Sequence, residues 1–315
     1  MRLSEILKGI TPLRIVGGDP EVKELCFDSR KAGEGSCFVA QVGTRVDGHQ
    51  YIGAVTAKGA VAVVCQKLPL KHIPGVTYVL VENSDVALGV MADNYYGHPS
   101  RQLKLIGITG TNGKTTTVTL LHRMFRQKGY HVGLLSTIVN KIDDEEIPAT
   151  HTTPDALELN ALLRRMADAG CQYAFMEVSS HSVVQHRIAG LTFAGGIFSN
   201  ITHDHLDFHK TMANYIAAKK MFFDNLPAGA FALTNVDDKN GMVMVQNTRA
   251  KVVTYSLQRM ADYHCRVLED TFQGMLLEEN GKEVWTRLVG RFNAYNLTAI
   301  YATARCCGME EEETD

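Results

Sequence analysis

A glycine-rich segment about a third of the way along the chain carries the residue types that hold phosphate groups. Gly110 and Gly113 leave backbone N–H groups uncovered, Lys114 adds a positive charge, and the hydroxyl of Thr115 can bind Mg²⁺. The spacing departs by one residue from the pattern G-x-x-x-x-G-K-[ST], because Ile108 stands where the first glycine is expected. We predict a binding site for ATP or GTP at residues Gly110, Thr111, Asn112, Gly113, Lys114, Thr115 and Thr116.

Acidic and imidazole side chains gather in the segment that follows. Six of the twelve histidines lie between His151 and His209, and Glu177 ends an apolar, strand-like run. A carboxylate at that position lies at the edge where open α/β sheets bind ligands, and it can share a Mg²⁺ ion with Thr115. An acid that caps the strand end is the alternative. The two histidines and two aspartates at 203–207 fit a solvated polar loop as well as a metal site.

One lysine lies on the apolar face of a helix predicted at residues 211–225. Lys219 follows Met212 by seven residues and Ile216 by three, so the helical period places it in the apolar stripe, whereas Lys220 points elsewhere. In one interpretation its stem covers the stripe and its amine reaches water. In the other, the amine is desolvated and its pKa is lowered. Such a neutral amine can add CO₂ and become a carbamate, which is a bidentate oxygen ligand.

These residues need a framework that brings strand ends together, and the sequence predicts an α/β fold that does so. Apolar runs alternate with segments of helical period, which indicates βαβ units and a mostly parallel sheet. We predict strands at 103–109, 131–136, 173–178, 196–200 and 230–234, and helices at 114–128, 155–169, 211–225 and 293–308. An Asn280–Gly281 turn within residues 263–289 indicates a β-hairpin.

A shorter α/β block precedes this one. Its predicted strands are 25–28, 36–41, 61–66 and 78–81, and its predicted helices are 51–58 and 85–96. A Gly/Pro cluster at 95–100 is typical of a linker. We therefore predict an N-terminal α/β domain at residues 1–98 and a central P-loop α/β domain with a mostly parallel sheet at residues 99–315.

The composition excludes several classes of protein. The 315 residues contain 32 Lys and Arg against 34 Asp and Glu, so no basic excess exists to bind nucleic acid. No apolar run reaches the roughly 20 residues of a membrane-spanning helix. The first residues lack the apolar core of a secretory signal, so we expect a cytoplasmic protein without membrane insertion. The seven cysteines include no C-x-x-C pair and are expected to be buried and reduced. The sequence predicts no particular oligomeric state.

Taken together, these motifs resemble the Mur ligase family of ATP-dependent amide-bond ligases. The matches are the loop G-T-N-G-K-[ST] at Gly110–Thr115, the strand-end Glu177, the segment N-x-x-x-D-H-x-D at Asn200–Asp207, the carbamylated lysine at Lys219, and the pair N-x-x-N at Asn293 and Asn296. Residues 28–48, 151–154 and 176–187 are similar to the branch of the family that adds the third residue of the peptidoglycan peptide.

The resemblance implies a role for each matching residue. The residues expected to act in catalysis are Lys114, Glu177, His205 and Lys219. Thr115 and Glu177 would bind one Mg²⁺ ion, and a second would lie among Glu177, His205 and carbamylated Lys219. Asn293 and Asn296 would approach the adenine of ATP. Ser29 would hold the uracil nucleotide, and the sugar-peptide would be held by Thr152, Thr153, Ser179, Gln185 and Arg187.

The resemblance also implies a reaction with two small-molecule partners. The carboxylate of UDP-N-acetylmuramoyl-L-alanyl-D-glutamate would attack the γ-phosphate of ATP, which gives an acyl phosphate and ADP. The amine of a diamino acid, meso-diaminopimelate or L-lysine, would then displace phosphate and form the amide. Lys114 and the two Mg²⁺ ions would offset the charge that builds between carboxylate and phosphate.

One feature of the family has no match in the sequence. Its members carry a third, C-terminal domain of about 100–150 residues that closes over ATP and binds the incoming amino acid. We therefore expect this domain to be absent, the choice between diaminopimelate and lysine to be undetermined, and the 315-residue chain to bind nucleotides but ligate poorly. The alternatives are a folylpolyglutamate synthetase, another Mur paralogue or a non-catalytic nucleotide-binding fragment. A P-loop kinase or GTPase would need an acceptor or switch signature that we do not find.

Overall fold

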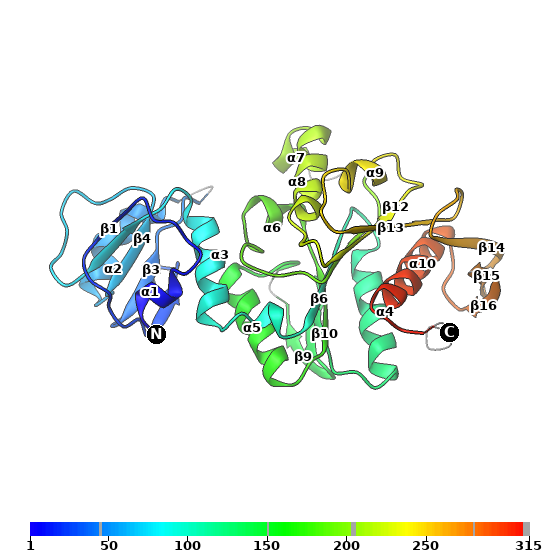
Figure 1. Ribbon diagram of the computed structural model, residues 1–315, viewed down its shortest axis with the longest axis horizontal. Coiled ribbons are helices and arrows are strands. Elements are labelled where there is room, and N and C mark those ends of the chain that lie inside the picture. Colours follow the sequence, from blue (N-terminus) through cyan, green and yellow to red (C-terminus); the bar gives the residue numbers. More distant parts are fainter. Residues whose placement is uncertain (44–45, 150, 203–205, 280, 311–315) are drawn as a thin grey trace. The chain divides into compact units, whose positions relative to one another are not determined.

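The computed structural model describes residues 1–43, 46–149, 151–202, 206–279 and 281–310 (Figure 1). The chain divides into two compact units. Unit 1 comprises Met1–Pro99, Pro154–Arg164 and Gln185–Leu191, and unit 2 comprises Ser100–Thr153, Arg165–Val184 and Thr192–Asp315. Both contain a sheet of mostly parallel strands with helices, so the predicted α/β class is confirmed. Among the described residues, no helix combines the length and apolarity needed to cross a membrane.

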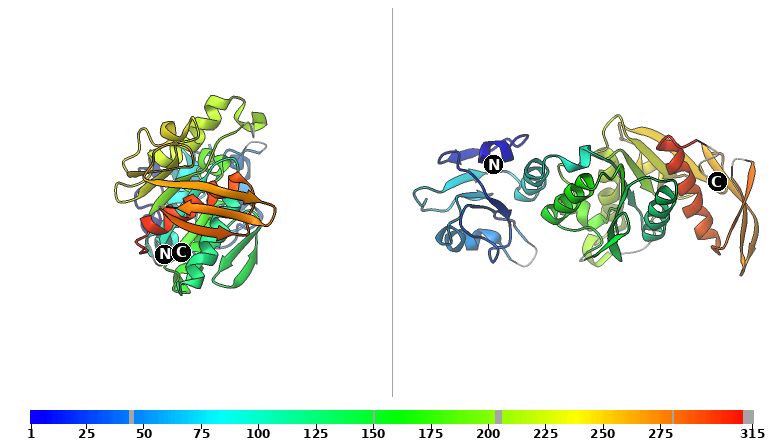
Figure 2. Two further views of the ribbon diagram at one scale, coloured as in Figure 1. Left: turned by 90° about the vertical axis from the view of Figure 1, so that its right-hand side faces the viewer. Right: turned by 90° about the horizontal axis from the view of Figure 1, so that it is seen from below.

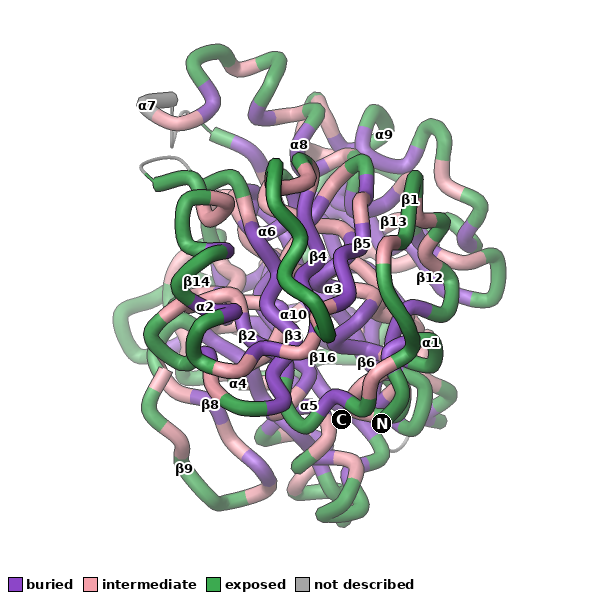
Figure 3. Tube along the Cα trace, turned by 90° about the vertical axis from the view of Figure 1, so that its left-hand side faces the viewer, coloured by how far each residue is buried: buried purple, intermediate pink, exposed green. Residues whose placement is uncertain are grey.

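Unit 1 is built on a five-stranded sheet with the order β1-β5-β4-β3-β2. The strands are β1 (Arg14–Val16), β2 (Glu24–Cys26), β3 (Ser36–Val39), β4 (Ala62–Cys65) and β5 (Thr77–Leu80). Strands β2 to β5 are parallel, and β1 pairs antiparallel with β5 at one edge. Every residue of β3 and β4 is buried, which is why these strands read as unbroken apolar runs (Figure 3).

The helices of this part of the chain are α1 (Leu3–Ile6), η1 (Gly48–Tyr51), α2 (Ile52–Ala57) and α3 (Ser84–Tyr95), and a further 3-10 turn, η2, spans Pro99–Arg101. Helix α3 begins after Asn83, whose side chain accepts hydrogen bonds from the backbone N–H groups of Asp85 and Val86. The strands and helices predicted for the first block are all present, whereas the short elements α1 and β1 were not predicted.

Unit 2 is built on an eleven-stranded sheet with the order β16-β15-β14-β13-β12-β11-β6-β10-β7-β8-β9. The strands are β6 (Lys104–Thr109), β7 (Val132–Leu135), β8 (Val139–Ile142), β9 (Glu145–Pro148), β10 (Tyr173–Glu177), β11 (Gly195–Phe198), β12 (Phe231–Asn235), β13 (Lys251–Ser256), β14 (Tyr263–Thr271), β15 (Gly274–Glu279) and β16 (Lys282–Thr286). The strands from β14 to β7 run parallel, and both ends of the sheet are extended by antiparallel hairpins.

The remaining helices are α4 (Lys114–Gln127), α5 (Ala156–Asp168), α6 (Ser180–Val184), α7 (Leu206–His209), α8 (Met212–Asp224), α9 (Gly241–Met244) and α10 (Arg291–Cys306). Helices α4 and α10 lie side by side (Figure 1). Helix α4 packs on β7 and β10, and α10 packs on β13 and β14. Between these helices and the sheet lies a core that includes Val118, Phe125, Phe175 and Ala299.

The predicted hairpin in the last third of the chain is confirmed. Strands β14, β15 and β16 form an antiparallel meander, shown in orange in Figure 2. In its β15–β16 ladder Glu279 stands opposite Lys282; Asn280 lies outside the described residues. Two parts of the sheet were not predicted. The hairpin β8–β9 is polar and mostly exposed along β9, so it lacks an apolar period. Strand β13 does carry a β-branched run, V-V-T, that could have been recognised.

Candidate active site

The carboxyl ends of four neighbouring strands bring the candidate residues to one edge of the unit 2 sheet. Strand β6 lies between β10 and β11, with Ile108 opposite Glu177 and Thr109 opposite Phe198. After β6 the chain first builds β7 and β10 on one side and then β11 and β12 on the other. The order therefore reverses beside β6, which is where parallel α/β sheets open a crevice for ligands.

The glycine-rich loop between β6 and α4 adopts a conformation that its glycines permit. Gly113, with a φ of +86°, forms the N-cap of α4, and a Cβ there would overlap the side-chain oxygen of Asn296. A Cβ on Gly110 would overlap the hydroxyl of Ser199. The Nζ of Lys114 folds back on the loop and donates to the carbonyl oxygens of Gly110 and Thr111, both at 2.9 Å. The loop is thus closed and backed by other residues, as an anion cradle requires.

Asn200 and its neighbour fix this loop from the end of β11. The side chain of Asn200 accepts from the N–H of Asn112 and donates to its carbonyl oxygen, each at 3.0 Å. Its own carbonyl oxygen accepts from the N–H of Thr111 at 2.8 Å. Ser199 donates to the Asn112 carbonyl oxygen at 2.8 Å. The predicted strand ends earlier than expected, at Phe198, because these two residues turn toward the loop.

Thr115 and Glu177, the predicted Mg²⁺ ligands, lie in direct contact. The hydroxyl of Thr115 donates to Glu177 Oε1 at 2.8 Å. Thr137, two residues after the end of β7, donates its N–H to Oε1 at 2.8 Å and its hydroxyl to Oε2 at 3.1 Å. The Glu177 carboxylate is only 1% exposed and receives these bonds from neutral donors. A buried carboxylate beside a hydroxyl fits a hard divalent cation. Thr137 was not predicted, although it follows a predicted strand at the same edge.

Lys219 is buried against the same loop. Its side chain is 1% exposed, and its Nζ donates to the carbonyl oxygen of Gly110 at 2.9 Å. The amine also lies 4.7 Å from the ring centroid of Tyr215. The interpretation in which this amine reaches water is therefore wrong. The placement of Lys220 on another face is confirmed, since it forms an ion pair with Asp224 at 2.6 Å.

A cavity of about 800 Å³ opens beside the loop. Its lining comprises Asn112, Gly113, Thr116, Asn200, Asn235, Asp237, Asp238, Gln258, Arg291, Phe292, Tyr295 and Asn296. Four of these residues were predicted for the nucleotide. Asn293 lies behind the lining, where its side-chain oxygen accepts from the Asn296 amide at 3.2 Å. Its own amide donates to the carbonyl oxygen of Val289 at 2.9 Å, so Asn293 holds Asn296 in place.

The polar segment Asn235–Asp238 was not predicted as part of this site. Asn235 donates to the carbonyl oxygen of Ser199 at 2.9 Å. Asp238 accepts from the N–H of Ile201 at 2.8 Å, and Asp237 accepts from the hydroxyl of Tyr295 at 2.9 Å. The segment thereby ties the ends of β11, β12 and α10 together. The segment could have been found from its place in the sequence, because it follows a predicted strand at the sheet edge that carries the loop.

The six residues predicted for the UDP-sugar-peptide are divided between the units. Unit 2 holds Thr152, Thr153 and Ser179, and unit 1 holds Ser29, Gln185 and Arg187. The hydroxyl of Thr153 donates to the backbone carbonyl oxygen of Glu177 at 2.9 Å and accepts from the N–H of Ser179 at 3.3 Å. The hydroxyl of Thr152 accepts from that of Thr137 at 3.2 Å. These hydroxyls therefore lie beside the candidate metal ligand.

In unit 1, Ser29 follows β2, and its carbonyl oxygen accepts from Lys58 at 2.8 Å. Arg187 is partly buried, and this burial lowers the pKa of its guanidinium while the charge of Asp155 opposes the shift.

Comparison with known proteins gives the family of the chain. Residues 108–304 match the pattern described as the Mur ligase middle domain, and residues 21–96 match the one described as the Mur ligase family, catalytic domain. The chain belongs to the Mur ligase family. The predicted resemblance is thus confirmed over most of the sequence.

Curated Mur ligases align with nearly the whole chain. It is 54% identical over 314 residues to a UDP-N-acetylmuramoyl-L-alanyl-D-glutamate--2,6-diaminopimelate ligase of Bacteroides fragilis, and 56% identical to the protein of that name in Phocaeicola vulgatus. Each match covers 99% of this chain and 65% of the relative. A solved structure of a ligase of that name has a TM-score of 0.83 and 26% identity, and the match covers 100% of this chain and 65% of that one. The chain therefore spans slightly less than two thirds of these Mur ligases.

The residues predicted to bind Mg²⁺ in this Mur ligase are placed as follows. Thr115 and Glu177 are in contact, and Lys219 lies on the loop that precedes Thr115. His205 and the neighbouring Asp204 fall outside the described residues. Across the described ranges, no group of three or more His, Cys, Asp and Glu side chains is arranged to hold a metal. A cation here would thus draw on the hydroxyl of Thr115, the carboxylate of Glu177 and oxygens of the nucleotide.

Proposed function

We propose that this chain forms the ATP-binding and UDP-sugar-binding part of an amide ligase of peptidoglycan precursor synthesis. The enzyme would act in the cytoplasm and join a diamino acid to UDP-N-acetylmuramoyl-L-alanyl-D-glutamate. The contact between Thr115 and Glu177 at the end of the phosphate loop is the observation that carries the proposal. The relatives are named as ligases of 2,6-diaminopimelate, which favours that diamino acid over L-lysine. Residues 1–98 are proposed as the UDP-sugar domain and residues 99–315 as the ATP domain.

The nucleotide would bind with its phosphates on the loop and its base in the 800 Å³ cavity. The backbone N–H groups at the start of α4 and the amine of Lys114 carry positive charge, so they favour the negatively charged phosphates of the nucleotide. Lys114 would exchange at least one of its two loop carbonyl partners for a phosphate oxygen. Asn296, held by Asn293, would contact the adenine. Mg²⁺ bound by Thr115 and Glu177, with a second ion near Glu177, His205 and carbamylated Lys219, would reduce the repulsion between the two reacting anions.

The chemistry proposed for the ligase has two displacement steps. An oxygen of the dipeptide carboxylate forms a bond to the γ-phosphorus, and the bond from this phosphorus to the bridging oxygen breaks, which releases ADP. The amine of the diamino acid then attacks the acyl carbon, loses a proton and displaces phosphate. Thr152, Thr153, Ser179, Gln185 and Arg187 would bind the sugar-peptide, and Ser29 the uracil nucleotide. Bound in this way, the carboxylate would be held near the phosphate, which makes the first step effectively unimolecular.

The proposed metal site is tested by removing the hydroxyl of Thr115. Thr115→Val keeps the shape of the side chain but removes a Mg²⁺ ligand and the bond to Glu177. We expect the gain in ADP affinity that Mg²⁺ confers on the chain to fall by about tenfold or more, as measured by calorimetric titration with and without Mg²⁺. Thr119→Val, an exposed position on the same helix, is the matched control and should keep this gain. An unchanged Mg²⁺ effect in Thr115→Val would refute the assignment.

The activity of a variant at Lys219 distinguishes a ligase from a non-catalytic binding module. In a ligase that uses a carbamate on this amine, Lys219→Ala should lower dipeptide-dependent ADP formation by about 10²-fold or more, because a ligand of the developing charge is lost. Added short carboxylic acids should restore part of that rate by occupying the vacated space. Lys220→Ala, whose ion pair with Asp224 lies on another face, should keep the rate. Measurable and equal rates in Lys219→Ala and the unchanged protein would contradict the carbamate, whereas no activity in either form would indicate a non-catalytic binding module.

A further inference from the structure

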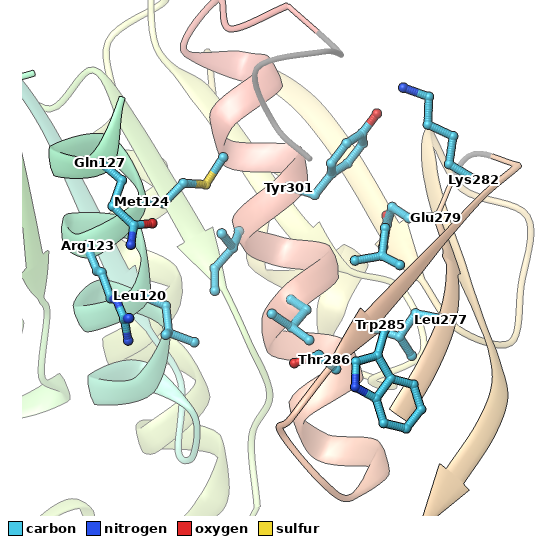
Figure 4. Close-up of a pocket in the computed structure, with 13 residues that line it drawn as sticks. Leu120, Arg123, Met124, Gln127, Leu277, Glu279, Lys282, Trp285, Thr286 and Tyr301 are labelled. Atoms are coloured by element: carbon cyan, nitrogen blue, oxygen red, sulfur yellow. The ribbon is translucent and has the colours of Figure 1, made fainter. Parts of the chain in front are cut away.

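Unit 2 contains a second cavity that shares no lining residue with the nucleotide cavity. It has a volume of about 360 Å³ and lies among the later turns of α4, the helix α10 and the hairpin β15–β16 (Figure 4). Pockets that take small organic ligands measure about 300–1000 Å³, so the space suffices for a small molecule. Nothing in the proposed ligase reaction uses this cavity.

The walls of the cavity are largely apolar. Leu120 and Met124 of α4 lie on one side of it and Leu277 of β15 on another (Figure 4). Ile300 of α10 and Val284 of β16 also line it. Leu277 and Val284 are directly opposite each other in the β15–β16 ladder, so they form one continuous surface. Such a surface would favour an apolar ligand body, since its burial removes apolar area from water on both sides.

One acidic side chain interrupts this apolar wall. Glu279 lies two residues after Leu277 on the same face of β15, and its side chain is 93% buried, being 7% exposed. Among the described residues, its Oε1 has no hydrogen-bond partner. Hydrogen bonds from the Cys265 thiol and the Thr298 hydroxyl to the rest of the carboxyl lower its pKa, but by less than burial raises it. Burial raises the pKa of the Glu279 carboxyl to about 7. A carboxyl group in such surroundings gains from a cationic donor, because the hydrogen bonds from Cys265 and Thr298 offset only part of its desolvation and leave Oε1 without a partner in the described part of the chain.

Two further features of the lining restrict the chemical class of ligand that the cavity can bind. The ring of Tyr301 borders the cavity on the side of Glu279, and the ring of Trp285 lines a part of the cavity further from Glu279 (Figure 4). Aromatic rings attract organic cations. Arg123 and Lys282 are exposed residues at the rim, and their positive charges disfavour a second cation at the outer end of the ligand. We propose that this cavity binds a small organic monoamine whose apolar body contacts α4 and α10 and whose ammonium group pairs with the Glu279 carboxylate.

The sequence supplies a direct probe for this site, because Trp285 is the only tryptophan in the chain. The experiment titrates the whole chain with 2-phenylethylamine at a pH of about 8, where the carboxylate is ionised, and records Trp285 fluorescence. The matched neutral probe is 2-phenylethanol. We expect a saturable change with the amine below roughly 10 mM, the range open to a ligand of this size. The alcohol should bind about tenfold more weakly, since it lacks the charge.

Two variants distinguish the contribution of the proposed ion pair to amine binding from the contribution of apolar contacts. Glu279→Gln keeps the shape of the side chain and should remove the preference for the amine, whereas Glu278→Gln, on the opposite face of β15, should retain it. ADP binding measured in the same variants shows that unit 2 is folded, and its outcome is independent of the cavity. Three results would overturn the proposal: no saturable change with the amine, equal binding of amine and alcohol, or unchanged amine binding in Glu279→Gln when ADP still binds.

Discussion

The carbonyl oxygen of Gly110 is a point at which two lysines meet. Lys114 of α4 and Lys219 of α8 both donate to it at 2.9 Å, one from the loop and one from the buried helix face. Lys114 stands at the start of α4, and its charge together with the helix dipole favours an anion beside the loop. The Glu177 carboxylate lies on the other side of Thr115, where its bonds come from hydroxyl and amide donors. Lysine amines thus contact the loop at Gly110, and a carboxylate contacts it at Thr115.

At the residue scale, Glu279 should make stability depend on pH. Burial raises the pKa of this carboxyl from 4.5 to about 7 in the folded chain, so the folded state holds the proton more tightly than the unfolded state. The stabilisation is complete below the unfolded pKa and is lost as pH rises through about 7. The difference between the unfolded and folded pKa of this carboxyl corresponds to roughly 3 kcal/mol of stability.

Urea unfolding at pH values of about 5.5 and 8.5 measures this effect. The free energy of unfolding should fall less between these two values in Glu279→Gln than in the unchanged chain. Glu278→Gln, whose ion pair with Arg266 is at the surface, should keep the original difference. Equal pH dependence in the unchanged chain and in Glu279→Gln would show that the carboxyl does not titrate as its burial indicates.

At the scale of elements, local pattern predicted the strands and helices that carry the loop, Glu177 and Lys219. The apolar runs and the helical periods of these elements are clear in the sequence. Once an element is recognised, the direction of the chain identifies the residues at its carboxyl end. Which strands become neighbours depends on pairing between distant segments, so the sequence did not predict that Asn235–Asp238 would meet the loop beside β11. Glu279 was missed for a similar reason, because its burial depends on packing between segments that are distant in the sequence.

The prediction at this scale concerns the support that the end of β11 gives to the phosphate loop. Asn200→Ala removes the two side-chain bonds to Asn112 while leaving the backbone bond to Thr111. We expect ADP affinity to fall about tenfold, because the loop must then be ordered on binding. Calorimetric titration measures this, with Asn225→Ala at the exposed C-cap of α8 as control. Full ADP affinity in Asn200→Ala would mean that the loop holds its shape without this side chain.

At the scale of the whole molecule, the chain forms two units and passes from one to the other more than once. Segments 154–164 and 185–191 belong to unit 1 although they lie between parts of unit 2 in the sequence. A prediction that assigns one continuous segment to each domain cannot place these two segments in unit 1. Our proposed substrate residues fall in both units. Binding of the UDP-sugar-peptide therefore tests the proposed function beyond the phosphate loop, which many nucleotide-binding proteins possess.

The most direct test is thermal stabilisation of the chain by UDP-N-acetylmuramoyl-L-alanyl-D-glutamate, compared with UDP and with folate. A ligand at about 100 times its Kd stabilises the folded state by about 2.7 kcal/mol, which raises the Tm of a chain of this size by a few degrees. We predict such a rise with the muramoyl-dipeptide nucleotide, a smaller one with UDP and none with folate. No rise with the muramoyl-dipeptide nucleotide, or a rise with folate in its place, would contradict the proposed substrate.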